Sequence, residues 1–245
     1  MKHRFLGAIL LGLASAATLA ACAPNPADDV PAAVEPAAEA PTEAVAVTMP
    51  TEAAPADAAA APDAAAVGAL PAGEFPLKGT IMFTASKVTR THHIVFKSWE
   101  GSYKSDGTPA GTSLNFSVDL ASLEVDQGQT AMLQDHLQSA EFFDVATFPK
   151  ATFTSSGIKE GVDQAVFAHA EGATHTVTGT LDIHGMQKEV SFPITLTSDG
   201  AGNISAKTQF SVDRQDFGLT YKGKADDLVR DEVVIEVDAS MAAAG

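Results

Sequence analysis

Apolar and polar residues alternate along most of the C-terminal two thirds of the chain. The alternation runs through residues 114–120, 177–183, 190–196, 204–212 and 233–237. A period of two with one apolar face is typical of β-strands that are buried on one side. Turn-forming pairs separate the apolar stretches, namely Asp106-Gly107, Ser156-Gly157, Glu171-Gly172, His184-Gly185 and Asp199-Gly200. The pattern predicts eight or nine strands.

One segment departs from this alternation. Residues 130–139 place Met132, Leu133 and Leu137 on one helical face, which predicts a short helix between two strands. No repeated strand–helix–strand pattern is present, so we expect an all-β, antiparallel sheet. A sheet of this many strands closes into a barrel or folds into a sandwich. The alternation does not distinguish a barrel filled by side chains from a barrel with a cavity.

The composition changes between residues 23 and 72. These 50 residues include 21 Ala, 9 Pro and eight acidic residues, and none is Lys or Arg. Frequent proline prevents long helices, and the few large apolar side chains cannot form a core. We predict a disordered, extended and self-repelling linker. It either holds the following domain away from a membrane or simply leaves that domain free to move.

The N-terminus has the parts of an export signal. Residues 2–4 (KHR) precede an apolar stretch at residues 5–19 that is too short to span a membrane. Residues 19–22 (LAAC) resemble the lipobox of bacterial lipoproteins. The resemblance implies cleavage before Cys22, a diacylglyceryl group on its sulfur and an acylated amino group, which together anchor a protein stably. The alternative is an ordinary secretory signal with a chance cysteine. Cys22 is the only cysteine, so no disulfide is expected within the chain.

The chain therefore divides into three predicted parts. Residues 1–21 form the lipoprotein signal peptide, residues 22–72 the lipidated cysteine and linker, and residues 73–245 one domain with a core. This domain carries 13 Lys and Arg against 23 Asp and Glu, and the whole chain has a net charge of −16. Such an acidic domain argues against nucleic acid as a partner and against charge-driven binding to anionic membranes. Membrane attachment would depend on the acyl chains on Cys22.

Several blocks of the predicted domain resemble the YceI-like lipid- and polyisoprenoid-binding family. They are residues 135–144 (DHLQSAEFFD) continuing to 148–155 (FPKATFTS), 177–185 (VTGTLDIHG), 212–218 (VDRQDFG) and 231–235 (DEVVI). Their order and spacing match the family over about residues 77 to 240. The resemblance implies a lipocalin-like antiparallel β-barrel of about eight strands with one short helix. It also implies an elongated apolar pocket whose ligands are polyisoprenoids or similar long-chain amphiphiles.

If the barrel is hollow, the apolar faces of its strands line the pocket. The candidates are Phe116, Val118, Leu181, Ile183, Phe192, Ile194, Phe210 and Val212. Each buried CH₂ group of a ligand contributes about 0.8 kcal/mol, so a long chain binds without precise polar contacts. The alternative for each residue is ordinary core packing, and the family resemblance favours a pocket for the set.

Two cations lie in phase with these apolar residues and are candidates for contact with a ligand head group. Arg214 follows Val212 by two positions and would hold a phosphate or pyrophosphate through paired hydrogen bonds. Lys87 similarly lies in phase with the preceding apolar residues Ile81, Phe83 and Ala85. For Arg214 we favour the alternative of an ion pair within the protein, because a buried arginine must be paired. The acidic partners available to it in the sequence are Asp216, Asp231 and Glu232.

The sequence points to binding and not to catalysis. The histidines lack metal-ligand spacing, and no nucleophile motif is present, so we expect no metal, no cofactor and no catalytic residue. We expect a protein that binds, sequesters or transports a long-chain lipid in the bacterial cell envelope. Two alternatives are an anchored scaffold or envelope-stress factor with a solid core, and an enzyme acting on a lipid head group. Protein partners are not indicated.

The same signals give an expected location. The protein should be exported and anchored, facing the periplasm or the cell exterior. Ala23 follows the anchor in place of the aspartate linked to inner-membrane retention, which favours the outer membrane in a cell that has one.

Overall fold

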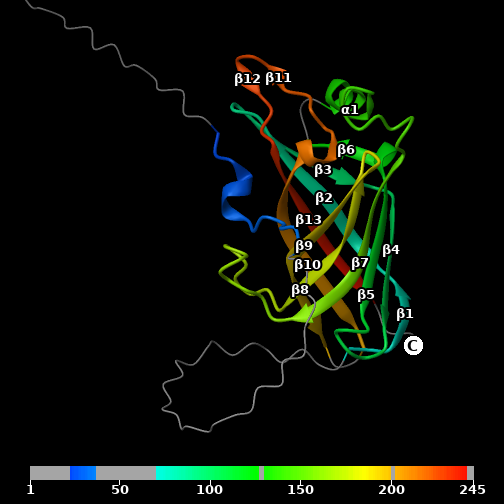
Figure 1. The fold of residues 1–245 in the computed structure, drawn as a ribbon. Helices are drawn as coiled ribbons and strands as arrows, with labels where there is room; N and C mark the ends of the chain where they lie inside the picture. Colours follow the sequence, from blue (N-terminus) through cyan, green and yellow to red (C-terminus); the bar gives the residue numbers. More distant parts are fainter. Residues whose placement is uncertain (1–22, 37–69, 127–129, 200–201, 242–245) are drawn as a thin grey trace, which may run out of the picture.

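The computed structural model describes residues 23–36, 70–126, 130–199 and 202–241 (Figure 1). The main strands are β1 (Gly73–Pro76), β2 (Lys78–Ser86), β3 (Thr91–Phe96), β4 (Trp99–Ser105), β5 (Ser113–Asp119), β6 (Leu123–Val125), β7 (Lys150–Glu160), β8 (His175–Ile183), β9 (Met186–Ser198), β10 (Ile204–Asp213) and β13 (Glu232–Met241). A separate hairpin consists of β11 (Gly223–Lys224) and β12 (Asp227–Leu228). The helices are α1 (Thr130–Gln138) and the 3-10 helices η1 (Pro26–Asp29), η2 (Leu120–Ser122) and η3 (Arg214–Phe217). The predicted signal peptide, Cys22 and residues 37–69 of the predicted linker lie outside the described residues.

The main strands form one sheet in the order β1-β4-β5-β7-β8-β9-β10-β13-β2-β3-β6. Its ends meet because β1 continues into β2 through Leu77 alone, while β1 pairs with β4 and β2 pairs with β3. These four strands therefore form one long, bent hairpin, and the sheet curls into a barrel (Figure 1). With each bent strand taken once, the barrel has eight long strands plus the short β6. The prediction of an all-β, lipocalin-like antiparallel barrel with one short helix is confirmed.

The burial pattern follows the period of two on which the prediction rests. In β8, Val177 and Leu181 are buried, whereas Thr178 and Thr180 are half-exposed. One predicted turn, at Ser156-Gly157, is wrong: it lies inside β7, where the pairing with β8 shifts register. A β-bulge of this kind uses turn-forming residues without ending the strand.

The predicted helix is present as α1, but its orientation differs from the prediction. Leu137 is buried, whereas Met132 is 86% exposed. The periodicity located the helix correctly, and tertiary packing decides which of its apolar residues face the barrel.

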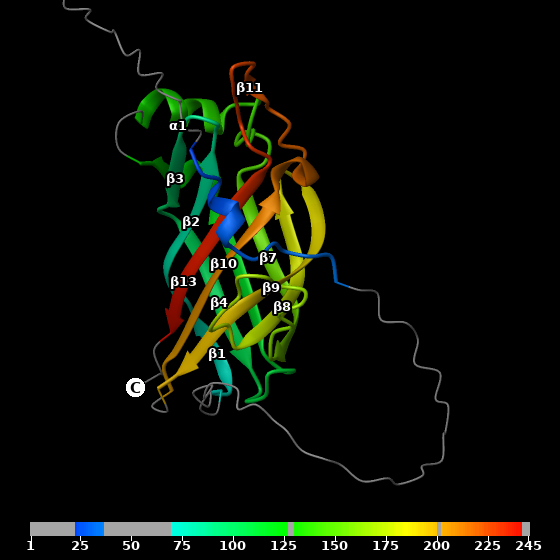
Figure 2. The ribbon, with the colours of Figure 1, turned by 90° about the vertical axis from the view of Figure 1, so that its left-hand side faces the viewer.

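The barrel wall has a gap between β9 and β10. These strands pair from Ile204–Ser198 only as far as Lys207–Thr195, and they pair no further along their length. Residues 31–34 lie in this gap (Figure 2). We call residues 23–36 the N-terminal strap.

Backbone hydrogen bonds join the strap to both sides of the gap. Ala33 donates its N–H to the carbonyl of Ser211 at 2.8 Å, and Ser211 donates to the carbonyl of Pro31 at 2.9 Å. On the other side, Val34 donates to the carbonyl of Ser191 at 2.9 Å, and Ser191 donates back at 2.7 Å. Pro31 is buried, and Ala33 packs against the core. The strap therefore completes the wall of the barrel.

The strap begins at the end of the barrel that carries α1 and the β11–β12 hairpin (Figure 1). There the N–H of Ala23 donates to the carbonyl of Val88 at 2.9 Å, and the guanidinium of Arg230 donates to the carbonyl of Ala23. Asn25 caps η1 by accepting from the N–H of Ala27. The prediction of an extended, free linker is therefore wrong for residues 23–36.

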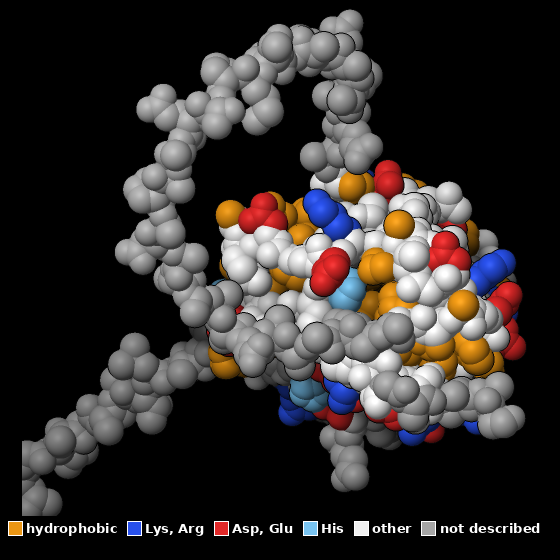
Figure 3. Space-filling view, turned by 90° about the horizontal axis from the view of Figure 1, so that it is seen from below, with side chains coloured by type: hydrophobic (Ala, Val, Ile, Leu, Met, Phe, Trp, Pro, Cys, Tyr) orange, Lys and Arg blue, Asp and Glu red, His pale blue; other side chains and the backbone are white. Residues whose placement is uncertain are grey.

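The opposite end of the barrel is filled by side chains. Tyr103, Leu196 and Ala239 are fully buried there, and Tyr103 donates its hydroxyl to the carbonyl of Pro71 at 3.2 Å. Figure 3 shows this end from below, where acidic, basic and hydrophobic side chains are mixed over the surface. The interior therefore closes toward this end.

The buried His175 should make the fold sensitive to mild acid. Burial lowers the pKa of His175 below its ordinary value, because the charged imidazolium would lose its hydration. Between the two pKa values the unfolded chain binds a proton that the folded chain does not, so stability falls as the pH drops below about 6.5. We expect this group to contribute a slope of no more than about 1.4 kcal/mol per pH unit.

Chemical denaturation between pH 7 and pH 5 measures this slope. Replacing His175 with Gln should flatten it, while His169→Asn should leave it unchanged because His169 is exposed and lies in a left-handed conformation that asparagine tolerates. An unaltered slope in the His175→Gln variant would contradict the prediction.

Candidate functional site

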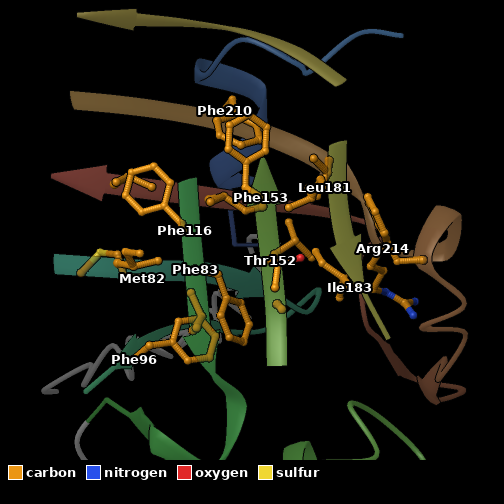
Figure 4. Close-up of a pocket in the computed structure, with 18 of the residues that line it drawn as sticks. Met82, Phe83, Phe96, Phe116, Thr152, Phe153, Leu181, Ile183, Phe210 and Arg214 are labelled. Carbon is orange, nitrogen blue, oxygen red and sulfur yellow. The ribbon is translucent and has the colours of Figure 1, made fainter. Parts of the chain in front are cut away.

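The barrel encloses an apolar cavity between its filled end and the α1 end. About 130 Å³ of it is available to the centre of a water-sized sphere. A single water needs about 10–15 Å³ on this measure, so the space is far larger than a packing defect. All eight predicted pocket residues line it: Phe116, Val118, Leu181, Ile183, Phe192, Ile194, Phe210 and Val212. Figure 4 shows several of them converging from different strands.

Aromatic rings form much of the cavity wall. Phe192 on β9 and Phe210 on β10 stack across the gap, with ring centroids 4.1 Å apart and planes 7° apart. Phe153 on β7 contacts Phe192 at 5.3 Å. On the other side of the cavity, Phe83 lies 5.7 Å from Phe143 in an edge-to-face arrangement. Such rings provide a large apolar surface of fixed shape.

Few polar residues line the cavity. In the part of the chain that the structure describes, they are Thr152, Thr208 and Arg214. The hydroxyl of Thr208 already donates to the carbonyl of Pro193 at 2.7 Å. Because an apolar cavity without polar partners does not hold ordered water, it favours an apolar occupant.

Among the described residues that line the cavity, Arg214 alone is charged, and each of its three side-chain nitrogens donates a hydrogen bond. It donates to the carboxylate of Asp231 at 2.8 Å and, through Nε, to the carbonyl of Arg230 at 3.0 Å. It also donates to the carbonyls of Leu219 and Val229. Its side chain is 2% exposed. The structure thus places Arg214 in the ion pair with Asp231 that the sequence offered as the alternative to head-group binding.

Lys87, the second head-group candidate, lies apart from the cavity. It follows the end of β2, and its ammonium donates to the carboxylate of Asp227 at 2.9 Å. Hydrogen bonds from Lys87 and from Thr89 hold the pKa of Asp227 below its ordinary value. Lys87 therefore joins the β2–β3 turn to the β11–β12 hairpin.

The α1 end of the cavity is covered by aromatic residues. Phe142 and Phe143 follow α1 and line the cavity together with Leu219 and Val229. The ring of His136 on α1 lies 4.6 Å from Tyr221, which joins the helix to the segment after η3.

Sequence reasoning missed part of the cavity wall. The missed residues include Ile81, Phe83, Ala85, Phe96, Phe142, Phe143, Phe153, Ala206 and Leu219. A signal was present for some of them: Ile81, Phe83 and Ala85 share one phase in β2, and Ala206 shares the phase of Phe210 in β10. Leu219 lies in no strand, and only the fold brings it to the site.

The described parts of the chain contain no group of three or more His, Cys, Asp or Glu side chains arranged to hold a metal. Within residues 23–36, 70–126, 130–199 and 202–241, no helix has the length and apolar character needed to cross a bilayer.

An antiparallel barrel with an internal apolar cavity is the arrangement found in the class of β-barrels that hold a small ligand, such as lipocalins. Comparison with known families gives the particular assignment. The YceI-like domain family matches residues 76–241, so the chain belongs to this family, as the sequence motifs predicted. The strap precedes the matched range.

Two curated relatives illustrate the similarity. A UPF0312 protein of Pseudomonas fluorescens (strain SBW25) is 30% identical over 151 residues, covering 59% of this chain and 72% of that protein. Protein YceI of Salmonella arizonae is 31% identical over 106 residues, covering 43% of this chain and 49% of that protein. The chain thus spans about half the length of the Salmonella relative.

Solved structures share the fold. BcnA of Burkholderia cenocepacia has a TM-score of 0.55 and 28% identity, covering 66% of this chain and 96% of that one. A polyisoprenoid binding domain from Saccharophagus degradans, implicated in plant cell wall breakdown, has a TM-score of 0.50 and 20% identity, covering 69% of this chain and 98% of that one.

Proposed function

We propose that this protein binds a long-chain apolar lipid, such as a polyisoprenoid, inside its barrel and does not act on it chemically. The observation that carries the proposal is the cavity: aromatic and aliphatic residues form its walls, and Arg214, the one charged residue among the described residues that line it, is already paired with Asp231. Such a wall attracts a ligand in proportion to the apolar area that it removes from water. The polyisoprenoid binding domain of the same fold supports this choice of ligand class.

The proposed location is the bacterial cell envelope. The export signal and the lipobox-like residues 19–22 support cleavage and acylation at Cys22, with the barrel outside the cytoplasm. Two or more acyl chains anchor a protein stably, whereas one chain gives only marginal binding. The protein would then hold its ligand close to the membranes that contain such lipids.

Native mass spectrometry of residues 23–245 tests the binding. The protein should begin at residue 23 and not at residue 73, because the strap completes the barrel wall. After incubation with geranylgeraniol, we expect one discrete adduct that is released by organic extraction. A mass that stays unliganded with geranylgeraniol and with fatty acids would overturn the proposal and favour a scaffold with a solid core.

A further inference from the structure

The strap fixes where the membrane anchor leaves the barrel. Ala23 is held by the carbonyl of Val88 and by the guanidinium of Arg230, at the end of the barrel that carries α1 and the β11–β12 hairpin. Cys22 directly precedes Ala23 in the chain, and consecutive Cα atoms lie about 3.8 Å apart. An acyl chain on Cys22 would therefore start beside this end of the barrel.

The long segment at residues 37–69 does not separate the anchor from the barrel. It follows the strap in the chain, and the strap is bonded to β9 and β10 through residues 31–34. The distance between the anchor and the barrel is therefore set by strap contacts, and not by the length of residues 37–69.

A second observation marks the same end of the barrel. The exposed large hydrophobic residues include Met132 at 86%, Leu228 at 48% and Met186 at 47%. Met132 lies on α1, and Leu228 ends β12. Met186 begins β9 beside Gly218, which follows η3. Three separate elements thus place apolar side chains at the end where Ala23 is held.

Charge at this end is compatible with a lipid surface. Lys222, just before β11, and Lys224 are exposed near Leu228, and the acidic residues of the hairpin are Asp226, which is exposed, and Asp227, which is paired with Lys87. Lysine side chains at a membrane interface extend toward the head groups while their carbon chains contact apolar surface. Residues 222–228 therefore carry no net charge, whereas the chain as a whole has a net charge of −16.

The cavity reaches toward the same end. Its lining there consists of Phe142, Phe143, Leu219 and Val229. The opposite end is filled by buried side chains such as Tyr103 and Leu196.

We propose that the α1 end of the barrel is a membrane-contacting surface, held against the bilayer by the strap, with Met132, Met186 and Leu228 touching the lipid. This rests on the proposed function, since it requires the anchor at Cys22 and a lipid ligand. An apolar ligand would then pass between the bilayer and the cavity without crossing water.

Fluorescence quenching in vesicles tests the orientation. Full-length lipidated protein is placed in phosphatidylcholine vesicles whose acyl chains carry bromine, a quencher of tryptophan. Trp99 is replaced with Phe throughout, and a single tryptophan is introduced by Met132→Trp, Met186→Trp or Leu228→Trp. Val166→Trp is the matched control, because Val166 is 49% exposed but lies in the β7–β8 connection, away from α1 and the β11–β12 hairpin (Figure 1).

We expect the three variants at the α1 end to lose most of their fluorescence and the Val166→Trp variant to retain most of it. Equal quenching at all four positions, or none at any of them, would overturn the proposal. Vesicle flotation of the same samples separates this failure from a missing anchor, because an unlipidated protein does not float. Ligand binding is measured independently by mass spectrometry.

A pair of insertions tests the role of the strap without altering its contacts. A flexible Gly/Ser spacer of about 20 residues, which spans roughly 25 Å, is inserted between Cys22 and Ala23. The control carries the same spacer between Ala58 and Ala59. The first insertion should abolish the quenching at Leu228→Trp, and the second should leave it unchanged. If both insertions have the same effect, the strap does not set the orientation.

Discussion

Replacing Arg214 with methionine should lower the free energy of unfolding by about 3–5 kcal/mol, since removing one partner of a buried ion pair leaves the other groups unsatisfied. The guanidinium of Arg214 is bonded to Asp231 and to the carbonyls of Leu219, Val229 and Arg230. Methionine fills the space but supplies no donor. For a chain of this size the loss corresponds to roughly 6–20 °C in Tm.

Chemical denaturation of residues 23–245 measures this effect, with Arg90→Met as the control. Arg90 is exposed, so its replacement should change stability by no more than about 0.5 kcal/mol. If Arg214→Met instead kept its stability and lost lipid affinity, Arg214 would be a head-group ligand.

Filling the cavity should weaken lipid binding by about 50- to 200-fold. Ala206 lines the cavity from β10 and is 2% exposed, so Ala206→Phe places a ring where the ligand would lie. Displacing three to four CH₂ groups of the ligand costs about 2.4–3.2 kcal/mol. A factor of ten in Kd corresponds to about 1.4 kcal/mol, which gives the expected range.

Titration with retinol, a fluorescent isoprenoid, measures the affinity of the folded variants. Ala151→Phe fills the same cavity from β7 and guards against one variant failing to fold. Ala168→Phe is the matched control, because Ala168 is exposed in the β7–β8 connection. Unchanged affinity in both cavity variants would place the ligand outside the barrel.

The sequence predicted the strands and the eight pocket residues for a clear physical reason. A residue such as Phe210 lies in phase with Val212 and Ala206, and a period of two puts such residues on one face of a strand. That the face surrounds a cavity came from the family resemblance, because alternation is the same in filled and hollow barrels. Met132 shows a similar limit of prediction for a helix. Periodicity places Met132 and Leu137 on one helical face but does not say which residues of that face contact the barrel.

The strap could not be predicted from composition. Its residues are mostly Ala, Pro and acidic, with few side chains able to form a core. Its contacts with Ser191 and Ser211 are made by the backbone, which every residue except proline can supply in full, so no side-chain pattern reveals them. Three of the four partners of Arg214 were hidden in the same way, because they are the backbone carbonyls of Leu219, Val229 and Arg230. The fourth, Asp231, was among the acidic residues that the sequence offered.

The strap also bears on how the barrel folds. Ala23 and Arg230 are 207 positions apart in the sequence, whereas the hairpins of the barrel join strands that are close in the chain. Contacts between distant segments form slowly, because the entropy of closing the loop must be overcome first. The hairpins should therefore assemble early. The gap between β9 and β10, which residues 31–34 of the strap fill, should be the last part of the wall to close.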